Sequence, residues 1–154
     1  MATQLTPADA RQSLNAHVAA KGAEIRLKFG PQIGWDQLQR ICEDRSCVRY
    51  PCEIVFDESN LGPGELAHPD PKGARPEDGF SMAIRPAFRT DLEGAVGPIL
   101  YQLVLVNYGA FASPEDAEAF GAAVLGIEEE EFYQSLCRLA DKVAPLRADL
   151  APTP

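Results

Sequence analysis

One segment of the chain, residues 97–107, limits what the whole protein can fold into. It reads Gly-Pro-Ile-Leu-Tyr-Gln-Leu-Val-Leu-Val-Asn, with Gln102 as its one interior polar residue. Because it is apolar on every side, the rest of the chain has to cover it on every side. Pro98 near its start and Gly109 after its end favour a helix, whereas the Leu-Val-Leu-Val run favours a strand. We expect a buried central helix and keep a buried strand as the alternative.

Four more helices are indicated around this segment. Thr6-Pro7-Ala8-Asp9 and Ser113-Pro114-Glu115-Asp116 each supply an N-cap residue, a first-turn proline and an acidic residue near the helix N-terminus. The first of these helices should end at Gly30, and Gly22 on its apolar stripe indicates close approach of a neighbour. Apolar residues at helical spacing indicate a short helix (Trp35, Leu38, Cys42) and a last helix (Phe132, Leu136, Leu139, Val143). We expect an N-terminal helical hairpin and a C-terminal helical pair.

Two strands are expected, at residues 52–57 and 80–85, because both segments are rich in β-branched, aromatic or alternating apolar residues. The 22 residues between them, 58–79, include four Pro and four Gly. We expect a long ordered loop held by Leu61 and Leu66, and keep a mobile, solvent-exposed loop as the alternative. The sequence therefore predicts one α+β domain with a small β-sheet over residues 1–154. Flexible tails are expected at residues 1–5 and 149–154.

The charge of the chain is acidic and unevenly distributed. The net charge is −9; residues 1–50 carry seven Lys or Arg and five Asp or Glu, whereas residues 51–154 carry seven and eighteen. Such a chain repels phosphate, so we expect no nucleic-acid partner. Residues 119–127 resemble the first helix and turn of a helix-turn-helix motif. The helix that would enter the DNA groove opens with Glu128 to Glu131, however, which opposes DNA binding.

Nothing in the sequence indicates targeting to or across a membrane. Residues 1–6 lack the basic start and apolar stretch of a secretory signal, and no apolar run approaches the roughly 20 residues of a membrane-spanning helix. We expect a soluble cytoplasmic protein with no membrane partner, in which the four cysteines are reduced. The expected partner is another protein or a second copy of the chain.

Three cysteines and a histidine have the composition of a metal site. Cys42, Cys47 and Cys52 follow one another at five-residue intervals, and His68 lies in the long loop. Structural zinc sites usually bring paired ligands about two to four residues apart on a tight knuckle, whereas these cysteines are five positions apart, so we expect that the spacing does not fit. These four residues are weak metal candidates, and we expect no metal and no cofactor. Free thiols are the expected state, with Cys47 the most exposed; a disulfide between two of the three is the alternative.

Candidates for acid–base catalysis are few, because the chain has only two histidines. His68 lies beside Asp70 and near Glu65, which makes these three the weak catalytic candidates. The sequence contains no nucleophile elbow, phosphate-binding loop or dinucleotide fingerprint. Whether the protein is an enzyme stays open, and we favour a protein without catalytic activity.

The middle of the chain resembles the zincin metallopeptidases in the order of its elements. Strand 52–57, strand 80–85 and the buried segment 98–108 follow one another as two strands and the active helix do in that family. Zincins carry H-E-x-x-H on this helix, where histidines one turn apart hold zinc and the glutamate activates its water. The corresponding residues here are Tyr101, Gln102 and Leu105. The resemblance implies a zincin-like scaffold that lacks the peptidase ligands.

Two hypotheses for function follow. The first is a non-catalytic protein-interaction or accessory module, in which the acidic C-terminal helices or the long loop contact a partner. The alternative is a small enzyme or metal-binding protein that uses the 58–79 loop, through His68, and the clustered cysteines. A pocket that holds His68 against a cysteine would favour the alternative.

Overall fold

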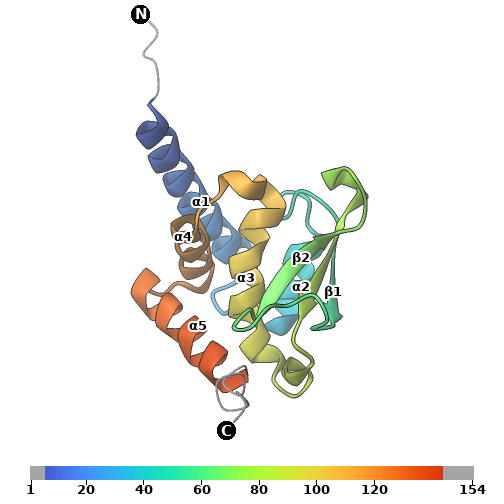
Figure 1. The fold of residues 1–154 in the computed structure, drawn as a ribbon. Helices are drawn as coiled ribbons and strands as arrows, with labels where there is room; N and C mark the ends of the chain where they lie inside the picture. Colours follow the sequence, from blue (N-terminus) through green and yellow to red (C-terminus); the bar gives the residue numbers. More distant parts are fainter. Residues whose placement is uncertain (1–5, 144–154) are drawn as a thin grey trace, which may run out of the picture.

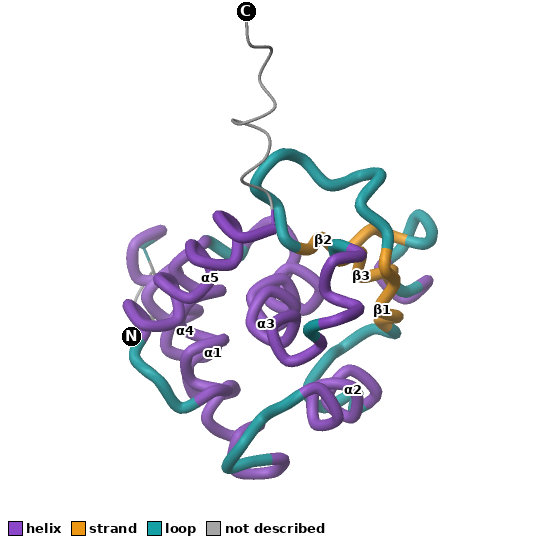
Figure 2. The backbone as a smooth tube through the Cα atoms, turned by 90° about the horizontal axis from the view of Figure 1, so that it is seen from below, coloured by secondary structure: helices purple, strands orange, loops and turns teal. Residues whose placement is uncertain are grey.

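Helix α3 (Leu92–Tyr108) runs through the middle of the fold, and the other elements surround it (Figures 1 and 2). The computed structural model describes residues 6–143, so the tails predicted at 1–5 and 149–154 lie outside the described residues. The predicted α+β class, with a central helix and a C-terminal helical pair, is confirmed. On one side of α3 lie the helices α1 (Pro7–Phe29), α4 (Pro114–Leu125) and α5 (Glu129–Val143). On the other lies a small sheet of β1 (Cys52–Phe56), β2 (Ala67–Pro71) and β3 (Phe80–Ile84), with α2 (Trp35–Glu43) next to β1.

Residues 97–107, for which a buried strand was the alternative, belong to a helix. The side chain of Asp91 caps α3 by accepting a hydrogen bond from the amide of Gly94 at 3.1 Å, and Gly109 ends the helix with a φ of 63°. The helix is buried along most of its circumference because α4, α5, α2 and the sheet all pack on it.

The length and composition of α3 correct one expectation. The stretch Leu92–Phe111 has 20 residues and a mean hydropathy of 1.2, enough by these measures to cross a membrane, so an apolar run of that length does exist. Half of this window is buried inside the fold. A helix that neighbours cover on most sides needs the same apolar composition as one that lipid surrounds.

Helices α1 and α4 begin at the predicted caps. The Thr6 hydroxyl oxygen accepts a hydrogen bond from the amide of Asp9 at 3.0 Å, and the Asp9 carboxylate accepts one from the Thr6 amide at 3.2 Å. Ser113 and Asp116 form the same reciprocal pair at the start of α4. Each pair satisfies backbone donors that a helix N-terminus leaves free, so the local sequence determines both boundaries.

Gly22 marks the place where α1 crosses α4. A Cβ atom added there would lie 2.7 Å from the carbonyl oxygen of Phe120 and 2.8 Å from the Cβ of Ala123. The close approach predicted from this glycine is therefore confirmed. Helix α2 follows α1 across residues 30–34, as expected for the N-terminal pair, but α1 makes its extensive contact with α4, and α2 packs on α3 and β1.

The sheet has the order β1-β3-β2, with β1 parallel and β2 antiparallel to β3. Strand β2 lies inside residues 58–79, so this segment is less of a loop than predicted. Pro69 and Pro71 concealed the strand, because proline has no N–H to give to a sheet. Lys72 donates its amide to the Gly79 carbonyl at 2.9 Å, so by alternation residues 69 and 71 direct their nitrogens away from β3. The free edge of β2 is thus poor in donors, which opposes pairing with another strand.

The rest of the segment is ordered around Arg85. This buried side chain donates to the carbonyl oxygens of Gly62 at 2.7 Å and Glu65 at 2.8 Å, both in the loop before β2. Leu61 is buried and Leu66 packs against the core, as expected of the two anchors. The loop is therefore held at a fixed position beside α3.

Candidate functional site

A cavity of about 290 Å³ opens between α3, α5 and the loop before β2. Its volume lies near the lower end of the range for small-ligand sites. Most of its walls are apolar, with a carboxylate, an amide, two phenol hydroxyls and a thiol placed around them. The lining residues are Gly64, Glu65, Leu66, Pro98, Tyr101, Gln102, Tyr133, Leu136, Cys137 and Ala140.

Gln102 supplies the polar group that distinguishes this cavity from an ordinary packing gap. Its Oε1 atom is buried and has no hydrogen-bond partner among the described residues. Buried polar atoms in folded proteins almost always have a partner, and leaving one without costs about 1–3 kcal/mol. An acceptor held in this state at a cavity wall is suited to a donor that enters with a ligand.

The surroundings of the cavity are acidic. Glu65 belongs to its wall, and Glu115 and Glu118 of α4 lie close enough to Tyr101 to act on its hydroxyl. Burial, and then these two carboxylates, raise the pKa of Tyr101. Burial likewise raises the pKa of Glu118, with further contributions from Glu115 and from the first turn of α5. A cation in this region would relieve the crowding of like charges.

Helix α5 contributes residues that the sequence did not single out. Tyr133 and Cys137 are one turn apart, so both face the cavity. A hydrogen bond to Cys137 raises the pKa of the Tyr133 hydroxyl, because the hydroxyl gives up this bond when it loses its proton. The sequence shows that Tyr133 and Cys137 are one helical turn apart. It does not show that α3 forms the opposite wall of the cavity, because only tertiary packing brings the two helices together.

Among the three acid–base candidates, Glu65 lines the cavity, and His68 lies next to Glu65. The Nδ1 atom of His68 is 3.6 Å from Oε2 of Glu65. Ala67 and Pro69 are the buried residues of β2, so His68 and Asp70 lie on the face of the sheet opposite α3. The structure therefore places His68 beside Glu65 but outside the cavity, and Asp70 further along the same face.

The clustered cysteines lie at the opposite edge of the sheet from His68, because β3 separates β1 from β2. The thiols of Cys42 on α2 and Cys52 on β1 interact, and this raises the pKa of Cys42 and lowers the pKa of Cys52. Cys47 is 3% exposed, so the expectation that it is the most exposed of the three is wrong. Within residues 6–143, His, Cys, Asp and Glu side chains form no group of three or more that could hold a metal ion.

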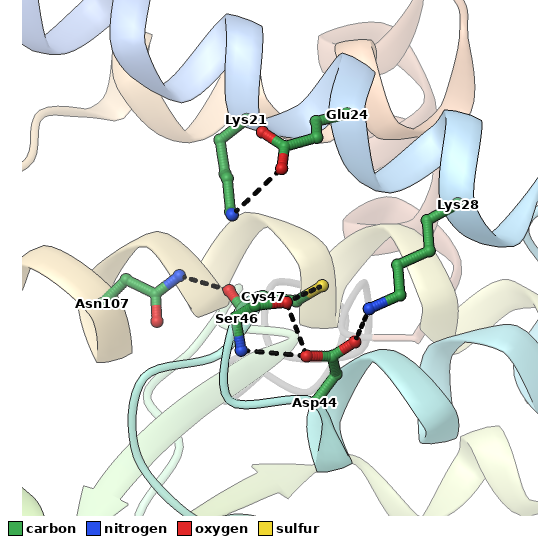
Figure 3. Close-up of polar contacts among 7 residues, drawn as sticks. All are labelled: Lys21, Glu24, Lys28, Asp44, Ser46, Cys47 and Asn107. Carbon is green, nitrogen blue, oxygen red and sulfur yellow. Dashed lines mark hydrogen bonds and ion pairs between the residues drawn. The ribbon is translucent and has the colours of Figure 1, made fainter.

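Cys47 belongs to a network that fixes the connection between α2 and β1 (Figure 3). Asn107 of α3 donates its Nδ2 to the Cys47 carbonyl at 2.9 Å. The Asp44 carboxylate accepts hydrogen bonds from the Ser46 amide at 2.9 Å and from Lys28 of α1 at 2.5 Å. Burial raises the pKa of the Cys47 thiol. This cysteine is a packed, protonated side chain, and the network around it is structural.

Comparisons with known proteins were made for the whole chain. No family model, curated protein or solved structure matches it.

Proposed function

We propose that the protein is a non-catalytic interaction module that binds a protein partner by accepting one of its Arg or Lys side chains into the α3–α5 cavity. The observation that carries the proposal is Gln102, which belongs to the cavity lining and whose buried Oε1 atom has no hydrogen-bond partner among residues 6–143. A guanidinium or ammonium group brings several N–H donors and a positive charge into an acidic region.

The shape of the cavity suits a long basic side chain. Leu66, Pro98 and Leu136 form apolar walls against which the methylene stem can pack. The charged head then reaches Gln102 and the carboxylate of Glu65, and both accept its hydrogen bonds. Buried anchors of this kind, Arg above all, often provide a large part of the binding energy of an interface.

The zincin-like resemblance supports the same proposal. Tyr101 and Gln102, which stand where a ligand and the catalytic glutamate of a zincin would be, line this cavity. Leu105, at the second ligand position, lines a neighbouring cavity together with Tyr101. On this proposal the scaffold keeps a binding cavity at the position of an active site and uses an amide and a phenol for recognition.

The alternative, an enzyme or metal protein using His68 and the clustered cysteines, needs these residues close together. Strand β3 lies between the strands that carry them, and His68 is on the sheet face opposite α3. We therefore favour the interaction module.

Fluorescence anisotropy with short labelled peptides of equal length, carrying Arg, Lys, Glu or Gln at the same positions, tests the proposal. We expect the Arg peptide to bind best and the Glu peptide not to bind. Gln102→Leu and Glu65→Gln should each weaken Arg-peptide binding about tenfold or more, because a hydrogen bond to a charged group contributes about 1.5–3 kcal/mol. Gln102→Leu should also raise the free energy of unfolding by about 1 kcal/mol, since the unpartnered oxygen is gone.

Glu77→Gln is the matched control. It removes the same charge from the exposed hairpin between β2 and β3 and should change the affinity less than about twofold. Equal weakening by Glu77→Gln and Glu65→Gln would mean that net charge, and not the cavity, attracts the peptide. Absence of binding by both basic peptides would contradict the proposed partner chemistry.

A further inference from the structure

Cys42 and Cys52 both line a second cavity, between α2 and β1. This cavity has a volume of about 320 Å³, and both cysteines belong to its lining together with Glu43 and Glu53. Cys42 is almost fully buried at the end of α2, whereas Cys52, the first residue of β1, is half-buried. The two thiols line the same cavity, and each shifts the pKa of the other. A reagent that enters the cavity meets Cys52, the more exposed of the two, more readily than Cys42.

The electrostatics distinguish the two thiols. The hydrogen bond from Cys42, and then the positive charges of Arg45 and Lys72, lower the pKa of Cys52 against the effect of burial. The same hydrogen bond, and then burial, raise the pKa of Cys42. Cys52 is therefore the more acidic thiol of the pair, and it is also the more exposed one. Thiolates are the nucleophilic form of cysteine, so Cys52 is the reactive member.

Arg45 has a fixed position beside this pair. Its guanidinium donates to the carbonyl oxygens of Cys42 at 3.0 Å, Val48 at 2.9 Å and Tyr50 at 3.2 Å. Three backbone acceptors from the connection between α2 and β1 thus hold one positive charge close to the thiols. These three hydrogen bonds fix the connection that joins Cys42 to Cys52.

We propose that Cys42 and Cys52 form a peroxide-reactive dithiol that closes reversibly into a disulfide between α2 and β1. The Cys52 thiolate attacks one oxygen of hydrogen peroxide, the O–O bond breaks, and the hydroxide that leaves takes a proton and becomes water. Cys52 is then a sulfenic acid. The Cys42 sulfur attacks the Cys52 sulfur, the S–O bond breaks, and the departing hydroxide leaves as water with the Cys42 proton. Two thiols and one peroxide give one disulfide and two waters, and a dithiol reductant restores the thiols.

The charges around the cavity select the oxidant. Glu43 and Glu53 belong to its lining, and Lys72 is paired with Glu53 at 3.2 Å. An anionic disulfide such as oxidised glutathione meets these carboxylates, whereas hydrogen peroxide is small and uncharged. Cys47, between the two in sequence, does not take part, because it does not line this cavity and its backbone is held by Asn107.

Peptide mapping after peroxide treatment of the full-length protein tests the proposal. Trypsin cleaves after Arg40, Arg45, Arg49 and Lys72, so Cys42, Cys47 and Cys52 fall in the separate peptides 41–45, 46–49 and 50–72. With one equivalent of hydrogen peroxide, followed by alkylation, we expect a cross-link between peptides 41–45 and 50–72 that dithiothreitol removes. Cys47→Ser and Cys137→Ser should form the same cross-link to the same extent. A cross-link that includes Cys47, or oxidation of Cys137 before Cys52, would overturn the proposal.

Two variants test the roles of the two sulfurs. In Cys42→Ser the sulfenic acid on Cys52 has no resolving thiol, so dimedone should label Cys52 in this variant and not in the wild-type protein. In Cys42→Ala the hydrogen bond to Cys52 is lost, and the pH at which iodoacetamide alkylates Cys52 half-maximally should rise. Thermal melts of both variants confirm that they are folded. An unchanged alkylation profile in Cys42→Ala would mean that Cys42 does not activate Cys52, and absence of dimedone labelling would rule out the sulfenic acid.

Discussion

Asn107 shows how one buried polar residue can determine the path of a connection. Its Oδ1 accepts a hydrogen bond from the Arg49 amide at 2.8 Å, and its Nδ2 donates to the Cys47 carbonyl at 2.9 Å. The side chain is 5% exposed, so these backbone groups have little access to water. One amide thereby satisfies a donor and an acceptor of the α2–β1 connection and attaches both to the end of α3.

We expect Asn107→Ala to lower the free energy of unfolding by about 2–3 kcal/mol, because it leaves two backbone groups without partners in a poorly hydrated site. Urea unfolding followed by circular dichroism measures the change. Asn60→Ala, at an exposed turn, should change it by less than about 0.5 kcal/mol. Equal effects of the two substitutions would show that the Asn107 bonds contribute nothing to stability.

Asp44 makes the stability depend on pH in the acid range. Its hydrogen bond with Lys28, and then those from Ser46, hold the pKa of this carboxyl below its ordinary value of 3.8. A pKa that is lower in the folded state gives a stabilisation that is complete above 3.8 and is lost as the pH falls through the folded value. Asp44→Asn should therefore flatten the fall in stability between about pH 5 and pH 2. Urea unfolding at several pH values checks this, with Asp141→Asn as the control for an exposed carboxylate.

At the scale of elements, two helical glycines have opposite surroundings. Gly22 of α1 has no room for a Cβ against α4, whereas a Cβ on Gly97 of α3 would lie 3.5 Å from Phe132 and 3.8 Å from Leu136, which is ordinary contact. Alanine is favoured over glycine in a helix by about 1 kcal/mol. The packing around each position therefore decides whether the substitution raises or lowers the free energy of unfolding. The same chemical change should thus have effects of different size in two helices of one domain.

Gly22→Ala should lower the free energy of unfolding by about 1–3 kcal/mol, because overpacking at the α1–α4 crossing outweighs the gain in helix propensity. Gly97→Ala should change it by less than about 1 kcal/mol, because crowding of the new Cβ against the following Pro98 opposes the gain in helix propensity. Thermal and urea unfolding of the two variants measure both values. A stabilising Gly22→Ala would mean that α1 can move away from α4 without loss.

The elements that the sequence predicts well are those with local signals. The caps at Thr6 and Ser113 determine two helix starts with neighbouring residues alone, and the apolar run of α3 required a central position. Strand β2 was missed because its prolines are tolerated only at a sheet edge, and edge position is a property of the folded sheet. The same division between local signals and properties of the folded chain applies to the residues of the two cavities. Gln102 stood out as a lone polar residue, whereas the pairing of Cys42 with Cys52 depends on how α2 packs on β1.

At the scale of the whole molecule, the acidic charge lies next to the cavity. Glu115 and Glu118 act on Tyr101 in the cavity wall, and the first turn of α5 acts on Glu118. The four glutamates 128–131 are all exposed, so they project a negative potential into the solvent at this end of α5. On the proposed function, these charges attract a basic partner before the cavity takes up its anchor. Attraction at a distance should then affect the association rate, and hydrogen bonding in the cavity should affect the dissociation rate.

Replacing Glu128, Glu129, Glu130 and Glu131 with glutamine should slow the association of the Arg peptide about tenfold at low salt, because steering by a local potential changes association rates by about 10- to 1,000-fold. Dissociation should change little, since none of the four lines the cavity. The difference should vanish near 1 M salt, where the screening length is about 3 Å. Stopped-flow fluorescence measures both rates. A matched variant with glutamine at Glu24, Glu43, Glu53 and Glu77 makes the same change in net charge on exposed surfaces elsewhere, so an equal slowing in both variants would show that total charge, and not its place beside the cavity, attracts the partner.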